Sequence, residues 1–275
     1  MASGYTEIVG RNAHHIKVEA QGGIVLKRVE PVWKEKHVVH SYEVDVRGRA
    51  KPHVLFRYML NSAWNHALSS EFSYEKLSNR GHFWALARFL MICNQFPQWN
   101  DQVVVETWGK DTDRFYALRD FIIHSTEGEK LVVATSSWLI LNTETYRPQK
   151  LDRLREYFPF QFGRHELDVK LDKIHALVRE QERSRYVVHF TDIDVNKHVN
   201  ASKYMQWMLD GYSVGILETK DLKSFELNFI AEAKIDDEII VSVESAKKHD
   251  LCSVRRVTDS KELCRARLEW AGDVE

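Results

Sequence analysis

The amino-acid sequence predicts an α+β fold built from two similar halves, each with one long helix packed against an antiparallel sheet. Residues 101–141 and 237–270 each contain three strand-like runs joined by short polar turns, a pattern typical of an antiparallel meander. Each meander opens on an aspartate and follows a further strand-like run, at 83–96 in the first half and at 224–233 in the second. Because the order of elements and the turns match, we interpret the chain as a duplication.

The individual strands follow from runs of β-branched and aromatic residues with alternating polarity. In the first meander these runs are residues 102–108, 115–124 and 131–141, and in the second they are 238–245, 251–257 and 263–270. A further strand is predicted at the start of each half, at residues 42–46 and 185–190.

Each half also contains one predicted long helix. The first follows Pro52 and has an apolar face with helical spacing, formed by Phe56, Leu60, Ala63 and Ala67. The second covers residues 201–210, with Asn200 as its N-cap. We therefore expect an N-terminal extension (1–35), an N-terminal unit (36–146), a linker that crosses between two sheets (147–184) and a C-terminal unit (185–275). Within the linker, residues 169–182 are predicted to form a short helix.

The composition excludes several classes of protein. The chain has 275 residues, 11% of them aromatic and 29% charged, which is typical of a globular protein with a real core. A formal net charge of −1 gives no basic field for nucleic acid. No apolar run approaches the roughly 20 residues of a membrane span, and the N-terminus lacks the apolar core of a signal peptide. The three scattered cysteines favour a reducing compartment, so we expect a cytoplasmic protein.

A dense polar stretch joins the predicted strand at 185–190 to the second helix. Residues 192–200 hold two carboxylates, two carboxamides and one imidazole. The amides at a helix N-terminus can stabilise developing negative charge, so this position suits catalysis. The alternative is a turn whose side chains only bond to their own backbone.

The sequence predicts no metal or other cofactor at this stretch. Asp192, Asp194 and Asn196 match the first, third and fifth positions of an EF-hand loop. The glycine and glutamate that such a loop needs at its sixth and twelfth positions are Lys197 and Lys203 here, which excludes calcium. A second histidine or cysteine at zinc-ligand spacing is also missing nearby.

With this stretch, the chain resembles the acyl-acyl-carrier-protein (acyl-ACP) thioesterases of plant plastids and bacteria. Residues 194–200 (Asp-Val-Asn-Lys-His-Val-Asn) are similar to the D-x-N-x-H-V-N loop of that family. The resemblance covers roughly residues 36–270 and includes segments of the first half at 65–67, 84–88, 97–101 and 105–108. It implies a tandem (double) hotdog fold, in which a curled antiparallel sheet wraps the long helix of each half. It also implies hydrolysis of fatty acyl-ACP to free fatty acid, which ends chain elongation.

The resemblance implies a catalytic set of Asp194, Asn196, His198 and Glu232, with Glu232 expected on a strand that passes beside the loop. Where the family has a cysteine after this glutamate, the chain has Ala233, which excludes a cysteine nucleophile there. Glu232 would activate water, or attack the thioester directly. Asn196 and His198 would polarise the carbonyl or hold the water, and Asp194 would orient His198. The corresponding turn of the first half, residues 46–50, lacks this set, so one site per chain is expected.

The first half would then hold the acyl chain, and we expect Phe56, Met59, Leu60 and Ala63 to border it. The implied partner is an acyl carrier protein, which is acidic, with Lys150, Arg153 and Arg155 of the linker as candidate contacts. A homodimer is compatible with the sequence. Two alternative functions stay open, a hotdog acyl-CoA thioesterase and a non-catalytic acyl-binding hotdog module.

Overall fold

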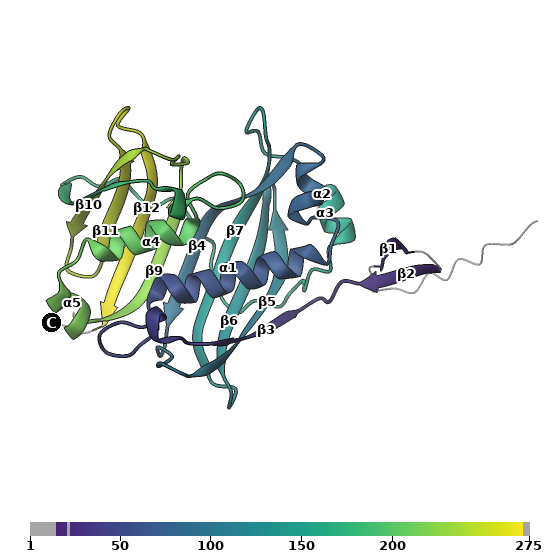
Figure 1. Ribbon diagram of the computed structural model, residues 1–275, viewed down its shortest axis with the longest axis horizontal. Helices are drawn as coiled ribbons and strands as arrows, with labels where there is room; N and C mark the ends of the chain where they lie inside the picture. The colour runs from purple at the N-terminus through teal and green to yellow at the C-terminus, as the bar shows by residue number, and fades with distance from the viewer. Residues whose placement is uncertain (1–14, 21–22, 272–275) are drawn as a thin grey trace, which may run out of the picture.

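One antiparallel sheet dominates the computed structural model, which describes residues 15–20 and 23–271 (Figure 1). Its ten strands have the order β3-β5-β6-β7-β4-β9-β12-β11-β10-β8. The N-terminal half contributes β3 (Trp33–Val38), β4 (His82–Cys93), β5 (Gln102–Asp113), β6 (Tyr116–Ser125) and β7 (Lys130–Asn142). The C-terminal half contributes β8 (Gln181–Val187), β9 (Asp221–Phe229), β10 (Glu238–Ser245), β11 (Asp250–Arg256) and β12 (Glu262–Ala271). A separate hairpin pairs β1 (His15–Ala20) with β2 (Gly23–Arg28).

The strand order confirms the duplication. From its outer edge to the centre, each half runs through an edge strand, the three strands of its meander and a last strand, β4 or β9. These two strands pair with each other, with residues 88–92 against residues 224–228, so that both halves share one continuous sheet. The expectation of two separate sheets is therefore corrected, while the predicted α+β architecture is confirmed.

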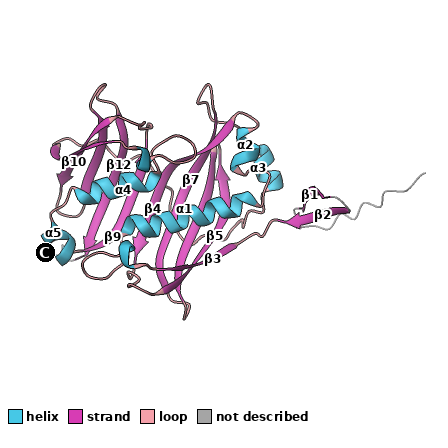
Figure 2. Ribbon diagram, in the orientation of Figure 1, coloured by secondary structure: helices cyan, strands magenta, loops and turns pink. Residues whose placement is uncertain are grey.

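Two helices cover one face of this sheet, α1 (Pro52–Leu68) and α4 (Ala201–Asp210) (Figure 2). Pro52 occupies the first turn of α1, where its missing N–H costs nothing. The side chain of Asn200 caps α4 by accepting a hydrogen bond from the Ser202 amide, as predicted. The main apolar core lies between these helices and the sheet.

The remaining helices are short: α2 (Tyr74–Ser78), α3 (Asp152–Tyr157), α5 (Val214–Thr219) and the 3-10 turns η1 (Ser41–Glu43) and η2 (Phe190–Asp192). Among the described residues, no helix is long and apolar enough to cross a membrane.

The predicted strand at residues 42–46 is wrong. Its first residues form η1, because the Glu43 carboxylate accepts hydrogen bonds from the His40 amide at 3.0 Å and from the Tyr58 hydroxyl at 2.5 Å. The edge strand of this half is β3 instead, so the predicted boundary at residue 36 falls inside a strand. The boundary at residue 185 likewise falls inside β8, which ends before the 3-10 turn η2.

The predicted helix at residues 169–182 is also wrong. Leu171, Ile174 and Leu177 are buried at a three-residue spacing, which an extended chain with three residues per turn produces as well as a helix does. The described backbone between residues 171 and 177 contains no helical turn.

Instead, the linker lies across the sheet on the face opposite the helices, since Arg88, Asn228 and Arg265 alternate with residues that face the core. Arg88 donates to the Leu171 carbonyl, the Asn228 side chain accepts from the Ile174 amide at 2.7 Å, and Arg265 donates to the Ile174 carbonyl at 2.8 Å. These three side chains are neighbours on β4, β9 and β12. The linker therefore covers the junction of the two halves.

Candidate active site

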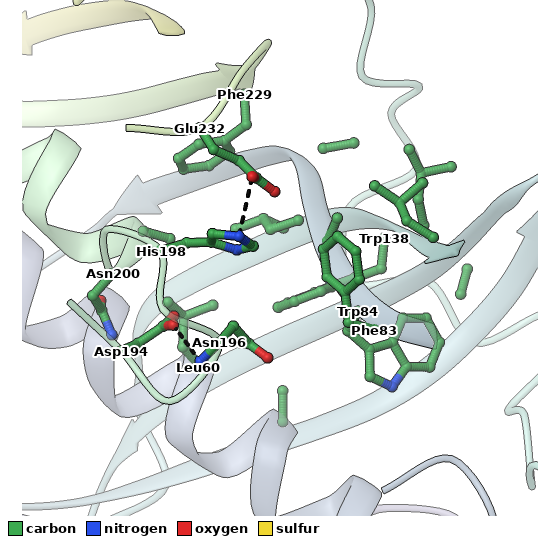
Figure 3. A pocket seen from close by; sticks show the side chains of 18 of the residues that line it. Leu60, Phe83, Trp84, Trp138, Asp194, Asn196, His198, Asn200, Phe229 and Glu232 are labelled. Atoms are coloured by element: carbon green, nitrogen blue, oxygen red, sulfur yellow. Dashed lines mark hydrogen bonds and ion pairs between the residues drawn. The ribbon is translucent and has the colours of Figure 1, made fainter. Parts of the chain in front are cut away.

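A cavity of about 760 Å³ lies between α1, the N-terminal part of the sheet and the loop before α4. Its volume is in the range of small-molecule binding sites. Apolar side chains line most of it, among them Leu60, Phe83, Trp84 and Trp138 (Figure 3). The polar residues Asp194, Asn196, His198 and Glu232 line one end.

Residues 193–199 form a tight loop that contributes three of these residues, Asp194, Asn196 and His198, to the cavity lining. The Asp194 amide donates to the His198 carbonyl at 2.8 Å, and the Lys197 amide donates to the Asp194 carbonyl at 2.9 Å. One oxygen of the Asp194 carboxylate accepts from the Asn196 amide at 2.8 Å. Lys197 has a φ of 63°, a conformation that non-glycine residues rarely adopt and that tends to persist at functional sites.

Glu232 reaches the cavity from the connection between β9 and β10. The expectation that it lies on a strand is corrected, because β9 ends at Phe229. The amides of Ile230 and Ala231 both donate to the Leu263 carbonyl, at 2.8 and 3.1 Å, which ends the regular ladder. The chain then turns toward α4, where the Ala233 amide donates to the Tyr204 hydroxyl at 3.0 Å.

His198 and Glu232 form the closest contact between predicted catalytic side chains. Their Nε2 and Oε2 atoms are 3.1 Å apart, and the two side chains point toward each other in Figure 3. Burial raises the pKa of Glu232, and the nearby Asp194 carboxylate acts in the same direction, whereas His198 and Lys234 oppose the rise. Both side chains keep part of their surface accessible, 22% for His198 and 29% for Glu232, so a substrate could reach them.

Asp194 does not hold the imidazole through the expected hydrogen bond. Within the described structure no hydrogen bond joins its carboxylate to the His198 ring, and the partner of that ring is Glu232. Asp194 instead fixes the backbone of the loop, and burial raises the pKa of its carboxyl group, whereas His198 lies close enough to oppose that rise. Asn196 also lines the cavity, and its catalytic role stays a prediction.

The structure separates the four predicted acyl-binding residues into two pairs. Leu60 and Ala63 line the cavity, whereas Phe56 and Met59 are fully buried in the core and are not part of its lining. Phe56 packs on Phe89 of β4, with ring centroids 4.1 Å apart. Trp84 and Trp138 also line the cavity, and no local signal in the sequence distinguishes them from tryptophans of the core.

No cluster of three or more histidine, cysteine, aspartate or glutamate side chains suited to hold a metal ion occurs in the described ranges. The arrangement present is a carboxylate–imidazole pair beside a helix N-terminus, at one end of an apolar cavity. Such a site can bind a chain-like apolar ligand and activate a water molecule next to its polar end.

Comparisons with known proteins agree with this geometry. Residues 30–156 match the family model of the acyl-ACP thioesterase N-terminal domain, and residues 175–272 match that of the C-terminal domain. The chain is 27% identical over 263 residues to a chloroplastic palmitoyl-acyl carrier protein thioesterase of Arabidopsis thaliana, covering 87% of this chain and 64% of the relative. An oleoyl-acyl carrier protein thioesterase of Coriandrum sativum is 28% identical over 258 residues, covering 88% and 70%. The chain thus spans less than two thirds of the length of several plant relatives.

Solved structures share the fold. A 12:0-ACP thioesterase from Umbellularia californica superimposes with a TM-score of 0.76 at 26% identity, covering 88% of this chain and 97% of the other. An acyl-ACP thioesterase from Bacteroides thetaiotaomicron gives a TM-score of 0.77 at 23% identity, covering 87% and 98%.

Proposed function

Since the chain belongs to the acyl-ACP thioesterase family, we propose that it hydrolyses the thioester of fatty acyl-ACP and releases free fatty acid. The observation that carries this proposal is the 3.1 Å contact between His198 and Glu232 at the polar end of an apolar cavity. The cavity suits the hydrocarbon chain, and the polar end suits the thioester.

In this mechanism, Glu232 acts as the general base. Its carboxylate takes a proton from water, the water oxygen attacks the thioester carbon, and the carbonyl oxygen becomes an oxyanion. The Asn196 carboxamide and the positive end of the α4 helix dipole are the candidates to stabilise that charge. When the carbon–sulfur bond breaks, the pantetheine sulfur takes the proton from Glu232, which restores the carboxylate.

Direct attack by the Glu232 carboxylate is the second route. The carboxylate oxygen would attack the thioester carbon and form an acyl anhydride, while the carbon–sulfur bond breaks and the pantetheine thiolate leaves and takes up a proton from solvent. Water would then hydrolyse the anhydride to the free fatty acid and the Glu232 carboxylate. His198 holds the carboxylate in either route, since its Nε2 atom lies next to Oε2. Neither route involves a thiol at this position, because the neighbours of Glu232 are Ala231 and Ala233.

The carrier protein would dock at the catalytic end of the cavity. Lys234 and Lys261 line this end, and neither forms a salt bridge with a described residue. The linker residues Arg153 and Arg155 are less suitable, because they lie over the aromatic rings of Tyr157 and Phe162 near α3, away from the catalytic loop (Figure 1). Because acyl carrier proteins are acidic, kcat/KM on acyl-ACP should fall as salt rises from low ionic strength to about 0.15 M. A kcat/KM independent of salt would contradict docking by charge.

The test compares acyl-ACP with acyl-CoA thioesters of identical chain length, with Glu232→Gln as the inactive control. We expect higher kcat/KM on acyl-ACP. Turnover of the CoA thioester alone would favour an acyl-CoA thioesterase, and tight binding of both without hydrolysis would favour a binding module.

A further inference from the structure

A single charged side chain lies on the cavity wall far from the catalytic loop. Of the lining residues between Leu60 and Phe160, only Arg119 carries a charge. Arg119 is on β6, and β7 separates β6 from β4, whose Phe83 packs beside His198. At the usual spacing of strands, β6 is about 10 Å from β4. Arg119 and Phe83 are also well separated along their strands, because Arg119 lies level with Phe89 of β4.

Among the described residues, the partners of the Arg119 guanidinium are all neutral. It donates to the His66 Nδ1 atom and to the Thr107 hydroxyl, both at 3.1 Å, and its Cζ atom lies 5.7 Å from the centre of the Phe158 ring. In the described part of the chain no carboxylate pairs with it. Burial lowers its pKa to about 10, so the group stays charged at neutral pH.

His66 is the neutral tautomer that this arrangement requires. Arginine can only donate, so Nδ1 of His66 must accept, and the ring proton is on Nε2, which lies 2.7 Å from the Glu30 carbonyl. Burial lowers the pKa of His66 to about 3, with Arg119 acting in the same direction. His66 therefore orients the guanidinium without compensating its charge.

The neighbouring strand β5 contains a second buried cation, which unlike Arg119 pairs with a carboxylate. Lys110 on β5 is also buried, but its ammonium lies 3.0 Å from the Asp120 carboxylate and donates to the Leu167 carbonyl at 2.8 Å. A buried charge without a counter-ion is costly, and such groups concentrate at functional sites.

The cavity wall is closed around Arg119. Phe158 and Phe160 pack directly on the backbone of Gly109, the residue that pairs with Arg119 across the sheet. A Cβ atom at position 109 would lie 2.9 Å from each ring, so only glycine permits this closure. A chain that enters at His198 and extends along the cavity therefore meets a guanidinium between aromatic walls.

We propose that Arg119 forms a polar subsite at the distal end of the cavity, which binds an oxygen function carried near the end of the acyl chain. A terminal carboxylate would pair best, because it can accept two hydrogen bonds from the guanidinium, and a hydroxyl or oxo group would accept one. A plain hydrocarbon end leaves the cation without an anionic partner, and sites built to hydrogen-bond a substrate discriminate strongly against analogues that lack the group. This inference rests on the proposed binding of acyl chains in the same cavity.

The experiment measures binding and turnover separately, with the full chain. Isothermal titration calorimetry compares free acids of equal length that end in methyl, hydroxyl or carboxyl groups, over several lengths. Steady-state kinetics uses the corresponding ACP thioesters. At the length that reaches Arg119, we expect the carboxyl-ended and hydroxyl-ended chains to bind about tenfold or more tightly than the plain chain.

Three substitutions assign this preference to the guanidinium. Arg119→Met should abolish it and improve binding of plain chains, Arg119→Gln should keep a preference for the hydroxyl alone, and Arg119→Lys should keep part of the preference for the carboxylate. Leu86→Met, on the apolar lining, is the matched control and should leave the ratio unchanged. If Arg119→Met fails to fold, the contrast between glutamine and lysine decides.

Plain chains that bind as tightly as oxygenated ones at every length would overturn the proposal, as would an unchanged ratio in the glutamine and methionine variants. In either case Arg119 only closes the cavity. Hydrolysis of plain acyl-ACP tests the proposed function independently, so failure of one is distinguishable from failure of the other.

Discussion

In the N-terminal half, residues 44–50 connect η1 to α1, and in the C-terminal half residues 193–199 connect η2 to α4. The two loops follow the same backbone path. Their ends are joined by equivalent bridges, between Val44 and Ala50 and between Ile193 and Val199. Asp45 accepts from the Arg47 amide at 2.9 Å just as Asp194 accepts from the Asn196 amide at 2.8 Å, and Gly48 and Lys197 both have positive φ.

The side chains on this shared backbone differ in what they contact. At the positions of Asn196 and His198, the first loop has Arg47 and Arg49. The counterpart of Glu232 is Phe96, since Ala50 donates to the Pro97 carbonyl as Val199 donates to the Ala233 carbonyl. Instead of a carboxylate–imidazole pair, the first half thus places the Arg49 guanidinium 5.2 Å from the centre of the Phe96 ring.

The arginines of the first loop hold the two halves together. Arg49 pairs with Asp45 and with Asp221, and Arg47 lies 2.8 Å from the same Asp221, which begins β9 of the other half. Asp194 and Asp45 thus do the same structural task in both loops, while the remaining positions have become chemical in one half and adhesive in the other. The two loops share a backbone path, and in the proposed mechanism the difference between them lies in the side chains of Asn196, His198 and Glu232.

The largest expected effect is the loss of turnover when the Glu232 carboxylate is replaced. Glu232→Gln should lower kcat by at least about 100-fold, because the general base is lost, while the melting temperature stays nearly unchanged. Steady-state hydrolysis of acyl-ACP and a thermal melt check this. A variant that keeps wild-type turnover would remove Glu232 from the mechanism.

A second prediction compares the two faces of α1. Ala63→Phe fills part of the cavity, so the preferred acyl chain should become shorter. The ratio of kcat/KM for short chains over long chains should rise by roughly tens-fold, because each buried methylene contributes about 0.8 kcal/mol. The measurement is kcat/KM on acyl-ACPs of graded length.

The matched control for that variant is Met59→Ala on the core-facing side of α1. It should lower the free energy of unfolding by about 2–5 kcal/mol without changing the length profile of the folded enzyme. A stable Ala63→Phe protein with an unchanged profile would show that the acyl chain lies elsewhere.

The third prediction concerns Arg49 in the loop of residues 44–50. Arg49→Met should lower the free energy of unfolding by about 1–2 kcal/mol, because Asp45 and Asp221 lose a charged partner. Chemical denaturation measures this loss, and kcat should stay at the wild-type value. A large drop in kcat with unchanged stability would mean that the first loop takes part in catalysis.

The smallest expected effect is electrostatic. Glu232 must be ionised to act as a base, and its pKa is raised by burial, so kcat/KM should fall with decreasing pH at a higher pH than an ordinary glutamate would give. Lys234 opposes that rise, so Lys234→Met should move the acidic limb further upward by a fraction of a pH unit. The substrate should be an acyl-pantetheine, to avoid any effect on carrier docking. An acidic limb that moves downward would contradict this assignment.

The sequence predicted those features that depend on local signals. Pro52 and Asn200 mark helix starts through their own backbone chemistry, and the alternating runs of the two meanders identify their strands. The helical face of α1 was also visible, but periodicity does not tell which of its residues face a cavity and which face the sheet. Leu60 and Phe56 therefore looked alike.

Other features depend on tertiary contacts. The residues of η1 alternate like a strand, and only the contact between Glu43 and Tyr58 determines otherwise. The spacing of Leu171, Ile174 and Leu177 fits both a helix and an extended chain. No signal in the sequence marks Arg119. What distinguishes it is the lack of a counter-ion among the described residues, and this depends on the tertiary structure.

The linker across the sheet keeps the two different loops, residues 44–50 and residues 193–199, together in one molecule. The strands that join the halves, β4 and β9, pair over only residues 88–92 and 224–228. As free chains, two such units would meet at their ordinary concentration and could pair with copies of themselves. A covalent tether raises the effective concentration of the correct neighbour, commonly to the millimolar range. Each catalytic loop is thereby matched with one cavity-forming half, and self-pairing that would yield molecules with two active loops or none is suppressed.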